Sequence, residues 1–146
     1  MTICLAGRII TVLALVAALG GCASMGKKSA FDQLGGMDQI RALSDSFVNN
    51  VASDSRTSSM LSGANLSSMR SKLSDQLCAI SGGKCSAPLS NAQIAEAGKK
   101  VSPSTSSALS DSFSRALDSV KANPVLKETV TKTMGPQLGG IVASLL

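Results

Sequence analysis

Apolar residues recur every three or four positions over most of the chain, which is the spacing of amphipathic α-helices. Residues 36–54 carry an apolar face formed by Met37, Ile40, Leu43, Phe47 and Val51. Residues 65–81 carry a second one formed by Leu66, Met69, Leu73, Leu77 and Ile80. No segment shows the strict alternation of a half-buried strand. The pattern predicts an all-α domain.

Two more helices are predicted in the C-terminal third. The first has Ser102 as N-cap and Pro103 at its first helical position, which is a favoured pairing. Its apolar face is Leu109, Phe113, Leu117 and Val120. The last helix starts near residue 125, and its apolar face is Leu126, Val130, Met134, Leu138, Ile141 and Leu145. We expect Gly135-Pro136 to kink it.

The segment between the second and third helices, residues 82–93, is rich in Gly, Ser and Pro and predicts a loop. It precedes "IAEAG", which has room for about one helical turn before Gly98. Asn65 is the expected N-cap of the second helix, and Gly82-Gly83 its end. The chain has only three phenylalanines and no Trp or Tyr, so the core must be mainly aliphatic side chains and Met.

Residues 1–21 have the layout of a secretory signal peptide, with Arg8, an apolar run and then small residues. The run is shorter than the roughly 20 residues that span a bilayer. The junction "LGGC" resembles the lipobox of bacterial lipoproteins, which implies a lipid on Cys22 and a periplasm-facing membrane anchor. The alternative is an ordinary signal peptide with an incidental cysteine. Ala23, in place of Asp, favours the outer membrane. Residues 22–30 would then be a tether and 31–146 the domain.

The net charge of +5 is a mild excess. Lysines and arginines form no run longer than a pair, and no Trp or Tyr is present to stack on bases. Nucleic-acid binders usually combine a basic stripe with a recognisable module. We therefore expect no nucleic-acid partner.

Cys78 and Cys85 remain in the mature chain once Cys22 carries lipid. Seven residues of straight helix rise roughly 10 Å, which is too far for a disulfide. Gly82-Gly83 should let the chain turn back, and the periplasm is oxidising, so a disulfide is plausible. Two free thiols and a metal pair are the alternatives. The metal pair has little support because the chain has no histidine and no second cysteine pair.

The absence of histidine also bears on catalysis. Neither a Ser/His/Asp nor a Cys/His arrangement can form, and no phosphate-binding loop is present. The aspartates fall on the polar faces of the predicted helices. We expect that the protein is not an enzyme and holds no metal.

Residues 31–54 resemble the first helices of group 1 truncated haemoglobins, small globins with a two-over-two helical sandwich around haem. The match continues in register through "ASDSR" (52–56), "SGANLSSMRSKL" (62–73), at the start of the distal helix, and "CAISGGKC" (78–85). The resemblance covers about residues 31–142. It implies a truncated-globin-like two-over-two fold.

The resemblance places the family's proximal histidine, the ligand of haem iron, at Glu96. A carboxylate is a poor equivalent because it is hard, acidic and strongly hydrated. We expect Glu96 to be an exposed, ionised residue that does not bind iron.

The distal side differs from the family as well. The oxygen-binding tyrosine that follows Phe47 is replaced by Val48, and the haem-wedging phenylalanine by Leu61. The distal helix carries Met69 and Leu73, where the family often has glutamine at the second position. Lys72 stands where a lysine can contact a haem propionate.

These differences favour a haem-free globin-fold lipoprotein that acts as a binding or structural module. Its pocket, which could hold an apolar ligand or collapse, would be lined by Val48, Leu61, Met69, Leu73 and Ile94. The alternative is a haem- and gas-binding protein without a histidine ligand. Its iron would then have no protein ligand or one that is not histidine. The candidates are the thioethers of Met69 and Met60, the amines of Lys72 and Lys99, and the thiols of Cys78 and Cys85 if these are reduced.

Overall fold

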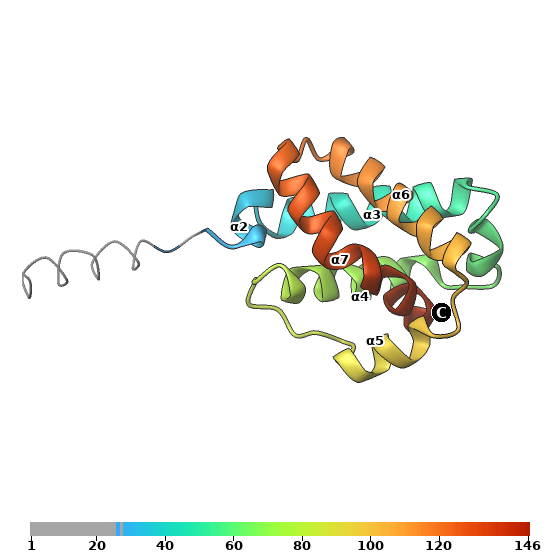
Figure 1. Ribbon diagram of the computed structural model, residues 1–146. Helices are drawn as coiled ribbons and strands as arrows, with labels where there is room; N and C mark the ends of the chain where they lie inside the picture. The colour runs from blue at the N-terminus through green and yellow to red at the C-terminus, as the bar shows by residue number, and fades with distance from the viewer. Residues whose placement is uncertain (1–25, 27) are drawn as a thin grey trace, which may run out of the picture.

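The computed structural model describes residue 26 and residues 28–146. The predicted signal peptide (1–21), Cys22 and most of the predicted tether (22–30) lie outside the described residues. Within them the chain is helical, without strands, which confirms the all-α prediction (Figure 1). The elements are α2 (Ala30–Leu34), α3 (Met37–Ser53), η2 (Ser58–Leu61), α4 (Leu66–Ile80), α5 (Asn91–Gly98), α6 (Pro103–Ser119) and α7 (Pro124–Leu145).

Four long helices form two crossed pairs. One pair is α3 with α4, and the other is α6 with α7. The two pairs meet where α3 contacts α6. The short helix α5 lies at the lower side of the molecule in Figure 1, against the C-terminal half of α7. No helix among the described residues has the length and apolar character needed to cross a membrane.

The core consists of the apolar faces that the periodicity predicts. Ile40, Leu43 and Phe47 on α3 are at most 1 % exposed, and the same holds for Leu109, Phe113 and Leu117 on α6. The rings of Phe47 and Phe113 meet edge to face, with centroids 5.6 Å apart and planes at 85°. This geometry stabilises an aromatic pair beyond its buried area. The remaining core is mainly aliphatic side chains and Met, as predicted.

Side-chain caps mark where the long helices begin. Asn65 Oδ1 accepts a hydrogen bond from the backbone N–H of Ser68 at 3.0 Å, and Ser102 Oγ accepts one from Thr105 at 3.2 Å. Each bond satisfies one of the unpaired N–H groups of a first helical turn. Both predicted N-caps are confirmed.

The prediction for α5 was too short. The helix begins at Asn91 and runs for 8 residues. It starts there because Ser90 and Gln93 form a capping box: Gln93 N–H donates to Ser90 Oγ at 3.3 Å, and Ser90 N–H donates to Gln93 Oε1 at 2.9 Å. The Gly, Ser and Pro content of the preceding loop masked this signal. Pro136 lies inside α7, which continues to Leu145.

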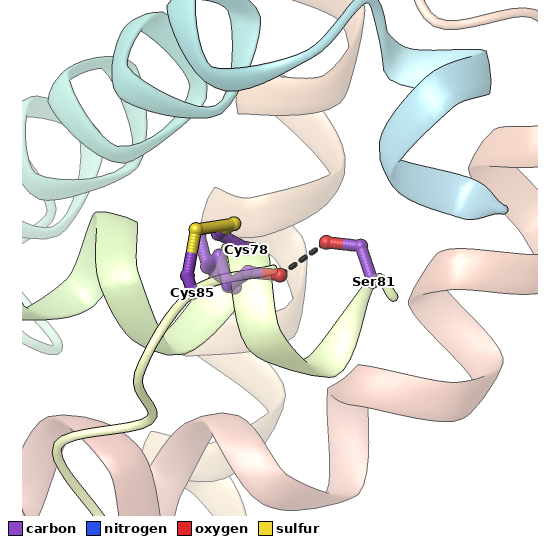
Figure 2. The surroundings of a disulfide bond; sticks show 4 residues. Cys78, Ser81 and Cys85 are labelled. Carbon is purple, nitrogen blue, oxygen red and sulfur yellow. Dashed lines mark hydrogen bonds between the residues drawn. A yellow bond between two sulfur atoms is a disulfide. The ribbon is translucent and has the colours of Figure 1, made fainter. Parts of the chain in front are cut away.

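A disulfide joins Cys78 to Cys85, with 5.8 Å between their Cα atoms (Figure 2). The chain turns back as predicted, because Gly82 adopts a left-handed φ of 90° that glycine tolerates best. Gly83 N–H then donates to the Cys78 carbonyl at 2.8 Å. A side chain at Gly83 would overlap Cys78 Sγ, so this turn requires glycine there too.

The C-terminal end of α3 is tied to α6 by charged side chains. Asp54 is only 10 % exposed and lies 2.7 Å from the Arg56 guanidinium and 3.5 Å from that of Arg115. Hydrogen bonds from the Arg56 side chain and backbone N–H hold the pKa of Asp54 well below its ordinary value. Arg56 also reaches Asp111 on α6 at 3.5 Å.

Loss of the disulfide should destabilise the domain. We expect Cys78→Ala together with Cys85→Ser to lower the free energy of unfolding by about 2–3 kcal/mol, the chain-entropy value for so short a closed loop. Urea unfolding measures this. Dithiothreitol should lower the midpoint of the unmodified chain and leave that of the double variant unchanged. An unmodified chain that is insensitive to dithiothreitol would contradict the bridge.

Asp54 should contribute to acid sensitivity. Its pKa is lower in the folded chain, so the unfolded chain binds more protons in the acid range. The stability that Asp54 adds is therefore fully present above the ordinary aspartate pKa of about 3.9. It is lost as the pH falls from that value toward the lower pKa of the folded chain. Asp54→Asn should flatten the fall of Tm below about pH 5. Asp38→Asn, at a side chain that is 94 % exposed, is the matched control. Equal slopes for Asp54→Asn and the parent chain would refute this role.

Candidate functional site

The position assigned to the proximal ligand lies on the outer face of α5. The Glu96 side chain is 67 % exposed, and its Oε2 lies 2.8 Å from Lys99 Nζ one turn further along the helix. The residue that α5 turns toward the core is Ile94, which is 4 % exposed. The helix therefore presents an ion pair to solvent and an aliphatic side chain to the interior.

The positions assigned to the distal pocket are part of the core. Phe47, Val48, Met69 and Leu73 are at most 1 % exposed, and Leu61 is 8 % exposed. They belong with Ile94 to one cluster of buried apolar side chains. The predicted pocket lining is thus brought together, and its members pack into a closed apolar interior.

The other residues considered as haem contacts lie farther out. Lys72 is exposed on α4, and Lys99 is 72 % exposed and paired with Glu96. Met60 on η2 is partly buried and packs against the core cluster. Lys72 and Lys99 thus lie at the surface, while Met69 is buried in the core. These side chains do not line a common pocket with Met60.

Gln76, which the sequence reasoning missed, holds the segment that leads into α5. Its side chain is 1 % exposed, and its Oε1 accepts a hydrogen bond from the Leu89 N–H at 3.0 Å. Gln76 follows Leu73 by three positions, on the face where apolar residues are expected. A polar residue at such a position was the available signal, because buried polar groups are nearly always hydrogen-bonded.

The end of α4 is anchored as well. The Ser81 hydroxyl donates to the Leu77 carbonyl, as the dashed line in Figure 2 shows. The Ser81 carbonyl in turn accepts the Phe31 N–H of α2 at 2.9 Å. Together with the disulfide and Gln76, these contacts fix the segment from Ser81 to Leu89 at both of its ends.

Side chains that can bind metals form no cluster in the part of the chain that the structure describes. No three side chains of His, Cys, Asp or Glu gather there in a way that could hold an ion. The two cysteines among the described residues, Cys78 and Cys85, form the disulfide.

Solved structures of a truncated haemoglobin share this fold. The truncated haemoglobin of Tetrahymena pyriformis in its Fe(III) form superposes with a TM-score of 0.67 at 17 % identity, over 73 % of this chain and 92 % of that one. Two mutant Fe(III) forms of that protein give a TM-score of 0.66 with the same identity and coverage. At this identity the likeness establishes the fold, and it confirms the predicted two-over-two architecture.

Sequence comparison agrees with the structural likeness. No curated protein sequence matches the chain significantly. The profile of a family described as bacterial-like globin matches residues 29–138, which is most of the chain. The chain therefore belongs to the bacterial-like globin family.

Proposed function

We propose that this globin is a haem-free lipoprotein of the bacterial cell envelope, and that it acts as a binding or structural module and not as an enzyme. The observation that carries the proposal is the orientation of α5. Glu96 points to solvent and pairs with Lys99 at 2.8 Å, while Ile94 occupies the inward position. A haem iron ligand would have to come from the inward face.

Glu96 is unsuited to turn inward. Moving an ionised carboxylate into an apolar interior is costly unless a partner follows it. Its partner Lys99 is itself exposed, and the core that surrounds Ile94 is apolar. The cost of burying this carboxylate therefore favours the outward orientation of Glu96.

The distal side supports the same proposal. Val48 has no hydroxyl to donate to bound oxygen, and Phe47 packs on Phe113 instead of facing a ligand. Sites for ligands of this size have volumes of several hundred Å³. Here the distal positions are filled by side chains that are almost fully buried against one another. Residues arranged in this way do not fit haem.

The alternative with another axial ligand is weakened by the same geometry. Of the four thioether and amine candidates, only Met69 lies within the core. Its burial at 1 % exposure means that a porphyrin could reach its sulfur only if neighbouring core side chains moved away. Close-packed interiors resist such changes.

The lipid anchor rests on the "LGGC" junction at Leu19–Cys22. Helix α2 begins at Ala30, eight residues after Cys22. A fully extended chain spans at most about 3.6 Å per residue, so a lipid on Cys22 would hold the domain within roughly 30 Å of a membrane surface. The domain would thus be displayed close to the envelope membrane.

Haemin titration tests the haem-free proposal. We expect the mature chain with Cys22→Ser to give only the broad absorbance of free or aggregated haemin, because α5 presents no inward ligand and core side chains fill the distal positions. Absorbance through the Soret region is the measurement.

A sharp Soret band that saturates at one haemin per chain would overturn the proposal. Met69→Ala, with Met60→Ala as the matched control on the partly buried η2, would then show whether the core thioether binds the iron. Loss of the band in the first variant alone would identify Met69 as the ligand.

Anchoring is tested on the full-length chain in a bacterial host. We expect the unaltered chain to enter the membrane fraction and to gain the mass of a lipid after removal of residues 1–21. Cys22→Ser should gain no lipid mass, because the thiol that would be alkylated is gone. Cys4→Ser, within the signal peptide, is the control and should keep the lipid mass. An unaltered chain without the mass of a lipid would exclude the lipid anchor.

A further inference from the structure

Helix α5 lies on α7 with the two backbones in direct contact. A methyl group added at Gly140 would overlap the carbonyl oxygen of Ile94, and it would lie 2.8 Å from the carbonyl carbon and 3.0 Å from Cγ2 of the same residue. Backbone atoms at such distances cannot yield as a flexible side chain would. Only glycine at position 140 is compatible with this position of α5.

The neighbouring glycines do not impose the same requirement. A methyl at Gly139 would meet the Val101 side chain at 3.3 Å, and one at Gly98 would lie 3.7 Å from the Gly140 backbone. The first contact is tight but involves a side chain, and the second is ordinary. Neither Gly139 nor Gly140 has a positive φ. Glycine lowers the stability of a helix interior relative to alanine, so its presence at position 140 needs a reason. The close approach of the α5 backbone provides that reason.

Contacts on both sides of α5 hold it in this place. Before the helix, Gln76 binds the Leu89 N–H at 3.0 Å. After it, Val101 packs on Gly139. Along it, Ser144 of α7 donates to the Gln93 carbonyl at 3.5 Å. Because these contacts are independent of one another, moving α5 away from α7 would break several of them.

We infer that Gly140 is the positioning residue that closes the interior of this globin. By letting α5 lie directly on α7, it places Ile94 in the core and turns Glu96 and Lys99 outward. The inference rests on the proposed haem-free function and deepens it. The packing of α5 on α7 excludes haem, and the absence of the proximal histidine is a second, separate loss. An imidazole restored on α5 would then not restore haem binding.

Two histidine variants test whether the missing ligand alone excludes haem. Glu96→His changes an exposed residue and should leave Tm nearly unchanged; Ile94→His places the imidazole on the inward face. In the mature chain with Cys22→Ser, we expect neither to give a saturable Soret band. A stoichiometric band in either variant, with none in the parent chain, would overturn the inference. A band in the parent chain would instead overturn the haem-free proposal.

Adjacent glycines provide a matched pair for the role of Gly140. Gly139→Ala and Gly140→Ala make the same chemical change in the same buried stretch of α7, so their effects on helix propensity are equal. We expect Gly140→Ala to lower Tm by roughly 5–10 °C relative to Gly139→Ala. It should also raise the fluorescence of an apolar dye such as anilinonaphthalene sulfonate several-fold, because the displaced α5 exposes the core.

The dye signal separates positioning from a loss of stability alone, provided that it is read well below Tm in variants with native circular dichroism. Equal Tm and equal dye fluorescence in the two alanine variants would overturn the role of Gly140. If Gly140→Ala does not fold, while Gly139→Ala does, the requirement for glycine is upheld, and Glu96→His still decides the haem question.

Discussion

The packing of α5 directly on α7 sets what the interior of this globin can contain. Contact between the Ile94 carbonyl and Gly140 leaves no side chain between the two helices. Ile94 then joins the buried cluster that includes Phe47, Met69 and Leu73. On the other side of α5, the Glu96–Lys99 ion pair faces solvent, and the Gln76 hydrogen bond holds the segment that leads into the helix.

The proposed function separates the globin fold of this chain from haem chemistry. The bacterial-like globin family is evident over residues 29–138, and the helical sandwich superposes on truncated haemoglobins. The apolar faces that build the sandwich are kept, because each buried side chain contributes free energy whether or not a ligand is present. The positions that serve a ligand are filled with residues that pack. A shared fold does not carry function with it, since function depends on the side chains of the site.

The long helices could be predicted because their signals are local. The spacing of Ile40, Leu43 and Phe47 specifies one buried face, and Asn65 and Ser102 mark helix starts by their own side-chain chemistry. The disulfide also had a local cause, in the turn at Gly82. The start of α5 was missed although its capping box was present, because the composition of the loop outweighed a motif of two residues, Ser90 and Gln93.

Glu96 was expected to be exposed and Ile94 to face inward, but the packing of α5 on α7 could not be predicted from the residues of α5. A helix of 8 residues has no periodic pattern long enough to define a face. What decides its orientation is a contact with Gly140, far along the chain, and a hydrogen bond from Leu89 to Gln76. Such long-range contacts leave no periodic signal, and a glycine inside a helix does not reveal which backbone lies against it.

The most direct measurement is a nuclear Overhauser spectrum of the mature domain, recorded alone and with one equivalent of zinc protoporphyrin, a diamagnetic analogue of haem. If α5 stays packed on α7, cross-peaks between the Gly140 α-protons and the Ile94 γ2 methyl are expected in both spectra, because the two groups are in contact. Loss of these cross-peaks on adding the porphyrin, with ring-current shifts at Phe47 and Met69, would contradict a closed interior and show that α5 yields to a haem-sized ligand.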